Sequence, residues 1–196
     1  MYQLLLDSSN IYLAVGLSKD KKVVDSIFYN AWQRQSEVMV EEIENILKRN
    51  NVDKKELDAI VVGIGPGSYT GVRIGVTIAK TIAYALHIPV YAKSSLSLLR
   101  IGNEPTICLF NARSGRSYFA VYEGKKPIEQ DKAITNEEVI KYIDEHPTYK
   151  ISGDTNQIGK QSEQFDIIKN LADFDESEKV ENIFTLNPTY LKDLLK

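Results

Sequence analysis

The apolar positions of the first fifty residues follow two periods, one typical of strands and one typical of a helix. Three short apolar runs, separated by turn-forming or charged residues, predict an antiparallel strand meander over residues 2–6, 11–17 and 23–29. Residues 36–50 carry apolar side chains at helical spacing on an arc of about 120°, which predicts a surface helix with Ser36 as its N-cap. The apolar arc of this helix consists of Met39, Val40, Ile43, Ile46 and Leu47.

A continuous apolar run at residues 59–64 predicts a strand that is buried on both faces of a sheet. This strand leads through a glycine-rich segment at 65–71 into a second helix, predicted over residues 70–86, and then into a short strand at 89–92. Strands and helices in this order, after a meander, predict an α/β layer built on a mixed sheet.

A second unit is predicted to begin after residue 101. Its elements are a strand pair at 106–110 and 118–122, a helix at 136–145, a strand at 149–152 and a helix at 157–171. The chain is therefore expected to divide into an N-terminal lobe of residues 1–101 and a smaller C-terminal lobe of residues 102–196. We expect the last residues to pack back on the first lobe.

Composition and charge restrict the class of protein. The 196 residues are 43% hydrophobic and carry 24 Lys and Arg against 27 Asp and Glu, which is typical of a globular protein, here with a net charge of −3. Without a basic excess, binding of tRNA or DNA by this chain alone is a minority hypothesis. No apolar run reaches the ~18–20 residues of a membrane span, and a single cysteine suits a reducing compartment. We therefore expect a cytoplasmic protein without membrane contact.

The most specific motif is GPGSYTGVRIG at residues 65–75, between the predicted buried strand and the second helix. Glycines there let the backbone turn tightly and present N–H groups at the start of the helix, where anions bind. Candidates for such a phosphate or carboxylate site are Gly65, Gly67, Ser68, Thr70 and Arg73. A tight structural turn capped by Ser68 or Thr70 explains the same residues equally well. The segment lacks the Gly-Lys-Ser/Thr of a Walker A loop and the third glycine of the dinucleotide fingerprint.

Asp7, Ser8 and Ser9 lie where the first predicted strand ends. In nucleotide-hydrolysing folds built on such a meander, an acidic residue at this place holds a metal ion. An aspartate is also an ordinary turn residue, and we favour that interpretation. The sequence offers no metal-ligand or nucleophile pattern, since His87 and His146 lie on separate elements and the single cysteine lies in an apolar run. We therefore expect no catalytic residue, no metal and no tightly bound cofactor.

The second helix has more apolar surface than one sheet face covers, an arc of about 200° against the ~100° that is usual. Small residues recur at every fourth position of this helix and form a ridge that permits close approach of another helix. The ridge consists of Gly71, Gly75, Ala79 and Ala83, with Ile82 beside it. We predict that the helices at 36–50 and 70–86 lie side by side, that the ridge and Val38 face a partner, and that the isolated chain is a homodimer.

Four segments resemble the bacterial TsaB (YeaZ) family of tRNA threonylcarbamoyladenosine biosynthesis proteins. GPGSYTGVRIG at 65–75 is similar to the glycine signature of that family, and LDSS at 6–9 is similar to its first-strand motif. NARSGRSY at 111–118 and NPTYL at 187–191 resemble two further family motifs, so the likeness covers nearly the whole chain. The sequence departs from the family pattern at Gln35, where His is common, and at Asn111, where Asp is usual.

The resemblance implies a fold of the actin-like ATPase superfamily, with two ribonuclease-H-like lobes that are each a mixed sheet flanked by helices. It also implies a non-catalytic subunit that acts with TsaD and TsaE in transferring a threonylcarbamoyl group to the adenosine next to the tRNA anticodon. Members of the family pair with TsaD, or with themselves, through two long helices of the first lobe. The resemblance then implies that tRNA is bound only through the complex and that ATP is used at the level of the complex.

Two other hypotheses are kept beside this one. The chain could be an active ATP-dependent phosphotransferase or hydrolase of the same superfamily, with Asp7 and the glycine segment at its active site. Alternatively, the glycine segment together with Asp7, Ser8 and Ser9 could form a vestigial nucleotide or anion site that tunes assembly without performing chemistry.

Overall fold

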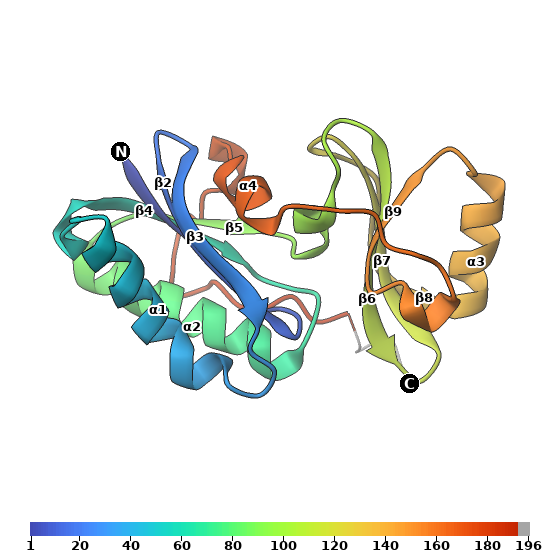
Figure 1. The fold of residues 1–196 in the computed structure, drawn as a ribbon, viewed down its shortest axis with the longest axis horizontal. Helices are drawn as coiled ribbons and strands as arrows, with labels where there is room; N and C mark the ends of the chain where they lie inside the picture. The colour runs from blue at the N-terminus through green and yellow to red at the C-terminus, as the bar shows by residue number, and fades with distance from the viewer. Residues whose placement is uncertain (192–196) are drawn as a thin grey trace.

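The computed structural model describes residues 1–191, which form two sheets, each with its own helices (Figure 1). The first sheet begins with the predicted meander, β1 (Tyr2–Asp7), β2 (Tyr12–Lys19) and β3 (Lys22–Asn30). Its helices and remaining strands are α1 (Gln35–Arg49), β4 (Leu57–Gly63), α2 (Tyr69–Leu86) and β5 (Val90–Lys93). The sheet has the order β3-β2-β1-β4-β5 and is mixed, because β1 and β2 are antiparallel while β4 runs parallel to both β1 and β5.

Alternation along β1 divides the core of this sheet between its two faces. Leu4 and Leu6 belong to the cluster that α1 and α2 cover, whereas Leu5 belongs to the cluster that α4 (Ile167–Ala172) covers (Figure 1). All three leucine side chains are fully buried. A strand covered on both faces carries a continuous apolar run, which is why the run at 59–64 folds as the neighbouring strand β4.

The second sheet has the order β8-β7-β6-β9. Its strands are β6 (Pro105–Arg113), β7 (Arg116–Glu123), β8 (Lys126–Thr135) and β9 (Lys150–Gly153). The helix α3 (Asn136–Glu145) packs on β7 and β8 and begins with a capping box between Thr135 and Glu138. Two sheets flanked by helices confirm the α/β fold class, and α3 confirms the helix predicted at 136–145.

Two predictions about the second half are wrong. The strand β8 is absent from the predicted elements, although it is the longest strand of its sheet. The helix predicted at 157–171 is instead a short 3-10 turn, Asn156–Ile158, then an irregular stretch, and only then α4. Gly159 ends the turn in a left-handed conformation with φ of 66°, which a continuous helix does not contain.

Two details of the first helix also differ from the prediction. α1 begins at Gln35 and its N-cap is Arg34, whose side chain makes no cap hydrogen bond, so Ser36 is not the N-cap. Val40 is 49% exposed and does not belong to the buried arc. The buried polar residue Gln35 lies at the start of that arc instead, and its side-chain amide donates to the Asn10 carbonyl at 3.1 Å.

The acidic segment before the C-terminus neutralises two buried cations beside the first sheet. The Lys93 ammonium lies 2.6 Å from the Glu178 carboxylate, and the Arg100 guanidinium lies 2.5 Å from that of Asp173. Burial lowers the pKa of Lys93, and the ion pair with Glu178 opposes that shift. The charge of this segment is therefore used inside the fold.

The residues that follow return to the first sheet. The Thr189 N–H donates to the Ile64 carbonyl at 2.7 Å, and the Lys80 ammonium donates to the Leu186 carbonyl at 2.9 Å. Residues 192–196, which are part of the predicted return, lie outside the described residues. Within residues 1–191, no helix is both long and apolar enough to cross a membrane.

We expect Glu178→Gln to destabilise the fold by about 2 kcal/mol, because the substitution leaves the buried Lys93 ammonium without its charged partner. Glu145→Gln is the matched control, since the ion pair between Glu145 and Lys141 is exposed and contributes little. Urea unfolding of the two variants measures the difference. Equal midpoints would show that burial adds nothing to the Lys93–Glu178 pair.

Candidate functional site

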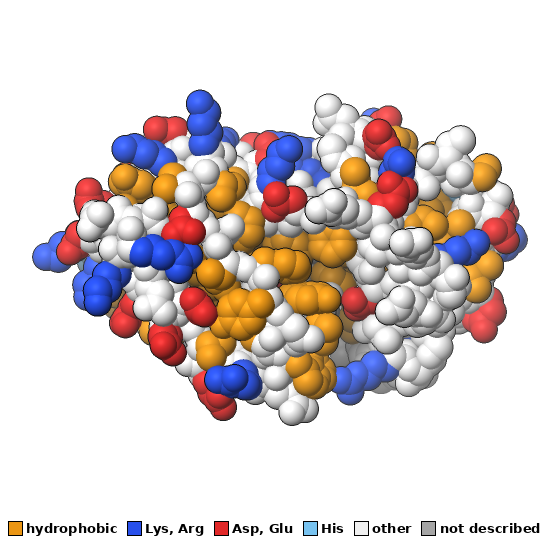
Figure 2. Space-filling view, viewed as in Figure 1, with side chains coloured by type: hydrophobic (Ala, Val, Ile, Leu, Met, Phe, Trp, Pro, Cys, Tyr) orange, Lys and Arg blue, Asp and Glu red, His pale blue; other side chains and the backbone are white. Residues whose placement is uncertain are grey.

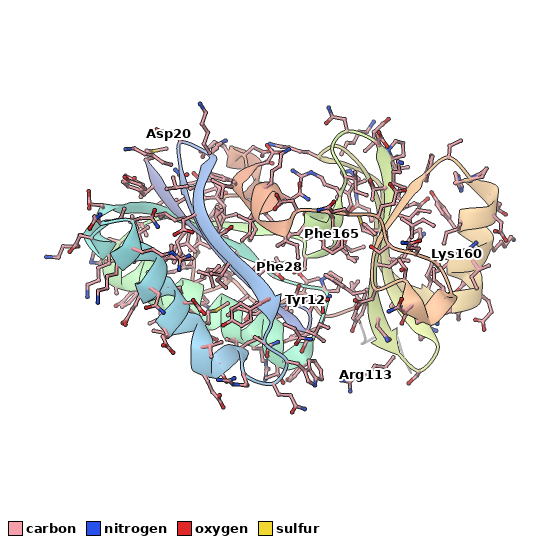
Figure 3. All side chains as sticks on the ribbon, in the orientation of Figure 1. Tyr12, Asp20, Phe28, Arg113, Lys160 and Phe165 are labelled. Carbon is pink, nitrogen blue, oxygen red and sulfur yellow. The ribbon has the colours of Figure 1, made fainter. Side chains whose placement is uncertain are left out.

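A cleft of about 1230 Å³ is lined by residues of both sheets. Figure 2 shows hydrophobic side chains gathered at the centre of this face of the molecule, between its two halves. Tyr12 and Phe165 lie near this place in Figure 3, and Arg113 lies at its lower end. Among the described residues that line the cleft, only Arg113 and Asp154 are charged. Aromatic, amide and hydroxyl groups make up much of the rest, so the cleft offers few of the cations that recognise phosphate groups.

The glycine segment joins β4 to α2 and is tied to the end of β1. Ser68 is the N-cap of α2, and its Oγ accepts the Gly71 N–H at 3.3 Å. The Ser68 N–H donates to the Ser9 carbonyl at 2.6 Å. A Cβ atom on Gly67 would lie 2.2 Å from the Ser9 carbonyl oxygen, and one on Gly71 would lie 2.0 Å from that of Ser8. Glycine is therefore needed at both positions, because two backbone segments cross there at close range.

This arrangement favours the structural interpretation of the glycine motif. The N–H groups of Ser68 and Gly71 are already used inside the fold, and Ser68 rather than Thr70 caps the helix. Arg73 does not line the cleft: its side chain is exposed, its Nε donates to the Tyr190 hydroxyl at 2.9 Å, and its guanidinium lies 4.2 Å from the ring centre of Tyr69. The predicted anion site therefore lacks the cation that the sequence assigned to it.

Asp7 belongs to the interior of the fold and is only 2% exposed. Its carboxylate accepts hydrogen bonds from the Ser9 N–H at 3.1 Å, the Ser9 hydroxyl at 2.9 Å and the Ser95 hydroxyl at 3.2 Å. A Cβ atom on Gly63 would lie 2.0 Å from the Asp7 Oδ1 atom. Burial raises the pKa of Asp7 to about 6, although these hydrogen bonds oppose the shift. Asp7 thus connects the ends of β1 and β5 and does not line the cleft.

The structure brings Ser8, Ser9 and Gly65 to the same junction. The Ser8 hydroxyl donates to the Gly71 carbonyl at 2.8 Å, and the Gly65 N–H donates to the Ser95 hydroxyl at 2.9 Å. Both groups therefore have partners within the fold. Of the residues at this junction, Ser9 and Gly71 also line the cleft, together with Gly67, Ser68 and Thr70 of the glycine segment.

The sequence prediction missed Ser95 and Asp154. Asp154 lines the cleft and bridges the two halves, because its carboxylate accepts from the Asn10 side chain at 3.3 Å and from the Asn111 N–H at 3.0 Å. Burial raises the pKa of Asp154. Their positions in the chain could have identified both residues. Ser95 follows β5 and Asp154 follows β9, and the carboxyl ends of parallel strands are the usual place for a site.

No group of three or more His, Cys, Asp or Glu residues within the described part of the chain is arranged to hold a metal ion. Two positions that an acid would need to occupy for metal binding at the strand ends are unsuitable here. The carboxylate of Asp7 is enclosed by hydroxyl and amide donors, and position 111, where the family pattern has an acid, holds a neutral asparagine.

The small-residue ridge of α2 faces the sheet of its own chain, so its assignment to a partner surface is wrong. Ala79 and Ala83 belong to the core, and both are buried. A Cβ atom on Gly75 would lie 3.0 Å from the Ser8 hydroxyl, and Gly71 contacts the backbone of Ser8 more closely still. The small residues thus allow the end of β1, which lies beneath the helix, to approach α2 closely. Val38 and Ile82, also assigned to the partner surface, are half-buried and pack against this same core.

The helices α1 and α2 do lie side by side, as predicted (Figure 1). Their solvent side carries a different set of residues from the predicted ridge. These residues are Val40, Thr77, Thr81, Tyr84 and Ala85. A partner that packs on this helix pair therefore meets threonines and scattered apolar side chains on α2. On α1 it meets Val40 beside exposed charged residues, which are Glu37, Glu41, Glu44 and Lys48.

A family model and curated relatives both connect the chain with proteins of tRNA threonylcarbamoyladenosine synthesis. Residues 29–182 match the family model described as TsaD: tRNA N6-adenosine threonylcarbamoyltransferase. The chain is 36% identical over 126 residues to the tRNA threonylcarbamoyladenosine biosynthesis protein TsaB of Bacillus subtilis, an alignment that covers 62% of this chain but only 55% of that relative. It is 30% identical to an uncharacterized protein of Mycoplasma genitalium, over 98% of this chain and 95% of the relative.

Solved structures show the same fold over nearly the whole length. YeaZ from Pseudomonas aeruginosa superposes with a TM-score of 0.80 at 23% identity, covering 97% of this chain and 99% of that one. This likeness and the family-model match give the chain the actin-like ATPase fold, with two helix-flanked sheets around a cleft. Because the family model covers more than half of the residues, the chain belongs to the TsaD family, and its relatives and fold place it with the TsaB (YeaZ) proteins.

Proposed function

We propose that this chain is the non-catalytic scaffold subunit of the complex that transfers a threonylcarbamoyl group to the adenosine next to the tRNA anticodon. In this proposal it acts in the cytoplasm with TsaD as the catalytic subunit and TsaE as a small ATPase. The complex, rather than this chain alone, binds the tRNA and uses ATP. The names of the TsaB relatives support the pathway, and the interior of the chain supports the scaffold role.

The enclosed carboxylate of Asp7 is the observation that carries the scaffold role. A metal-dependent phosphotransferase needs a carboxylate that reaches the metal and the phosphates in the cleft. Here three protein donors occupy the Asp7 carboxylate, and Asp7 is not a cleft residue. This enclosure of the Asp7 carboxylate counts against the competing ATP-dependent hydrolase. Tight binding of Mg·ATP to the isolated chain, with turnover abolished by Asp7→Ala, would establish the hydrolase instead.

We further propose that the solvent side of α1 and α2 is the surface that pairs with TsaD, or with a second copy when TsaD is absent. The apolar side chains Val40 and Tyr84 are exposed there beside a row of threonines on α2. Exposed aromatic and aliphatic groups on a helix pair are what a packed interface covers. The small-residue ridge supports the helix from beneath and takes no part in pairing.

Reconstitution with purified TsaD and TsaE tests the proposal. We expect threonylcarbamoyl transfer to tRNA to require this chain, and Thr81→Glu to fold normally but lose TsaD binding and activity, because it places a charge in the middle of the paired surface. Lys141→Glu on α3 is the control, since it alters an exposed helix position far along the chain. Full transfer without this chain would contradict the scaffold role, whereas normal activity of Thr81→Glu would move the interface elsewhere.

A vestigial anion site at the glycine segment is not needed for this proposal. Its obvious test, Gly67→Val, cannot discriminate, because any Cβ atom at that position collides with the Ser9 carbonyl and disturbs the fold itself. Titration of the unmodified chain with pyrophosphate is the better test. Binding that weakens in Ser68→Ala, with the fold retained, would support an anion site.

A further inference from the structure

Three of the four sheet edges in the described chain are covered or interrupted. The edge of β5 is covered by the returning segment, since the Val180 N–H donates to the Val90 carbonyl at 2.8 Å. The edge of β9 is covered in the same way by Glu163, whose N–H donates to the Ile151 carbonyl at 2.8 Å. The edge strand β8 contains Pro127 and two irregularities in its register with β7, both of which discourage pairing.

Within residues 1–191, the fourth edge, β3, has neither cover nor proline, and its one register irregularity lies at Val24, outside the segment from Ser26 to Asn30. The register of β3 with β2 determines which peptide groups of β3 face outward. The Ala31 N–H donates to the Ile11 carbonyl, and in an antiparallel pair every second residue bonds to the neighbouring strand while the residues between them point away from it. The peptide groups of Phe28 and Asn30 therefore point away from the sheet. Ser26 points the same way, although its N–H is directed at the Asp25 carboxylate.

Apolar side chains flank these outward groups on both faces of β3. Phe28 is 46% exposed and stacks on Tyr12 with ring centres 4.9 Å apart, and Tyr29 is 38% exposed on the opposite face. The helices α1 and α4 cover the two faces of the sheet but leave the edge itself open, as Figure 1 shows, and Phe28 and Tyr12 lie close together in Figure 3. Natural proteins seldom leave an apolar edge strand of this kind unpaired.

We propose that the β3 edge pairs with the β3 edge of a second copy of this chain, antiparallel about a two-fold axis at Phe28. In this register Phe28 lies opposite the partner's Phe28, Ile27 opposite the partner's Tyr29, and Ser26 opposite the partner's Asn30. The aromatic and β-branched pairs are those that stabilise antiparallel strands. The segment from Ser26 to Asn30 carries no charge, so no like charges oppose each other.

The symmetry argues for a second copy rather than an unrelated strand. An isologous interface must be complementary to itself, and this five-residue segment places like polar groups at its ends and apolar groups at its centre. The pairing lies at the edge of the sheet and leaves the solvent side of α1 and α2 free. It is therefore independent of the proposed pairing with TsaD.

The test uses opposite charges at the two-fold axis, in the full-length chain that also carries Thr81→Glu, so that helix-mediated pairing does not contribute. We expect this parent chain to dimerise in sedimentation velocity across the micromolar range, and Phe28→Lys and Phe28→Glu each to be monomeric, because each would face its own charge. Mixing the two variants should restore a heterodimer. The control, Ile128→Lys, changes an exposed apolar residue of the interrupted edge β8 and should dimerise like the parent.

Each other outcome overturns the proposal. A monomeric parent chain would show that the β3 edge does not recruit a second copy, and that an extended segment of a different protein is needed to cover it. A dimeric Phe28→Lys variant would place the dimer contact away from β3. Failure of the mixed variants to associate, with circular dichroism showing both folded, would exclude the register with Phe28 on the axis.

Discussion

Replacement of Ala79 by glutamate is expected to unfold the chain. Ala79 has no exposed surface and lies on the inner side of α2, within the core cluster of the first sheet. The substitution would bury an unpaired carboxylate and add volume to a packed interior, at a cost on the order of 5 kcal/mol. That cost is comparable with the whole stability of an ordinary domain, which is about 5–15 kcal/mol. Circular dichroism and limited proteolysis measure the loss of the fold.

Thr81→Glu provides the matched control on the same helix. Position 81 lies about 200° around the helix from position 79, and its hydroxyl only donates to the Thr77 carbonyl within the exposed side of α2. The same new side chain should therefore change the free energy of unfolding by no more than about 0.5 kcal/mol. An Ala79→Glu variant with a near-normal melting temperature would instead place the ridge on the surface and make it available to a partner.

The orientation of α2 shows what helical periodicity leaves undetermined. Periodicity alone predicts the extent of α2 to within one residue, but an apolar arc of about 200° contains more than one sector that could face the sheet. Contacts with Ser8 determine which sector faces the sheet, because the Ser8 hydroxyl and carbonyl both contact Gly71, 63 positions later in the chain. Spacing along one helix carries no information about the strand that passes beneath it.

The second half was harder to predict because its elements lack a one-sided pattern. β8 alternates between exposed and half-buried residues only in its first half and is half-buried throughout residues 131–135, and neither of its faces is rich in apolar side chains. Periodicity therefore gave no reason to continue the sheet beyond β7. In the region after β9, apolar positions at helical spacing suggested one long helix, but the left-handed Gly159 separates the 3-10 turn from α4.

The sequence predicts those parts of the candidate site that residues close together in the chain form. The glycine motif and the end of the first strand meet, as adjacent parallel strands of one sheet require, and Ser68 caps the helix that follows. The role of Asp7 could not be predicted, because it depends on Ser95, 88 positions away, and on the missing side chain of Gly63. The same local motif is compatible with an exposed metal ligand or an enclosed structural acid, and only the packed fold distinguishes them.

Asp7→Asn is expected to stabilise the chain near neutral pH and to flatten its dependence on pH. Burial raises the pKa of Asp7 from 3.8 to about 6, so the folded state holds the carboxyl proton more tightly than the unfolded state does. The stability from this group is therefore complete below the unfolded pKa and is lost as the pH rises through about 6. The difference between the two pKa values corresponds to about 3 kcal/mol.

Urea unfolding of the two chains between about pH 4 and about pH 7 tests this expectation. We expect the advantage of Asp7→Asn to grow across that range, because its neutral amide keeps an acceptor for Ser9 and no longer has to hold a charge in the interior. Asp20→Asn is the control with the opposite sign, since the N-terminal amine lowers the pKa of Asp20 at the surface. An Asp7→Asn variant that is less stable than the parent at neutral pH would show that the three hydrogen bonds outweigh burial.

Asp7→Asn also distinguishes the two proposed functions. A scaffold retains its support of threonylcarbamoyl transfer after this substitution, whereas an ATP hydrolase that relies on the Asp7 carboxylate loses its turnover.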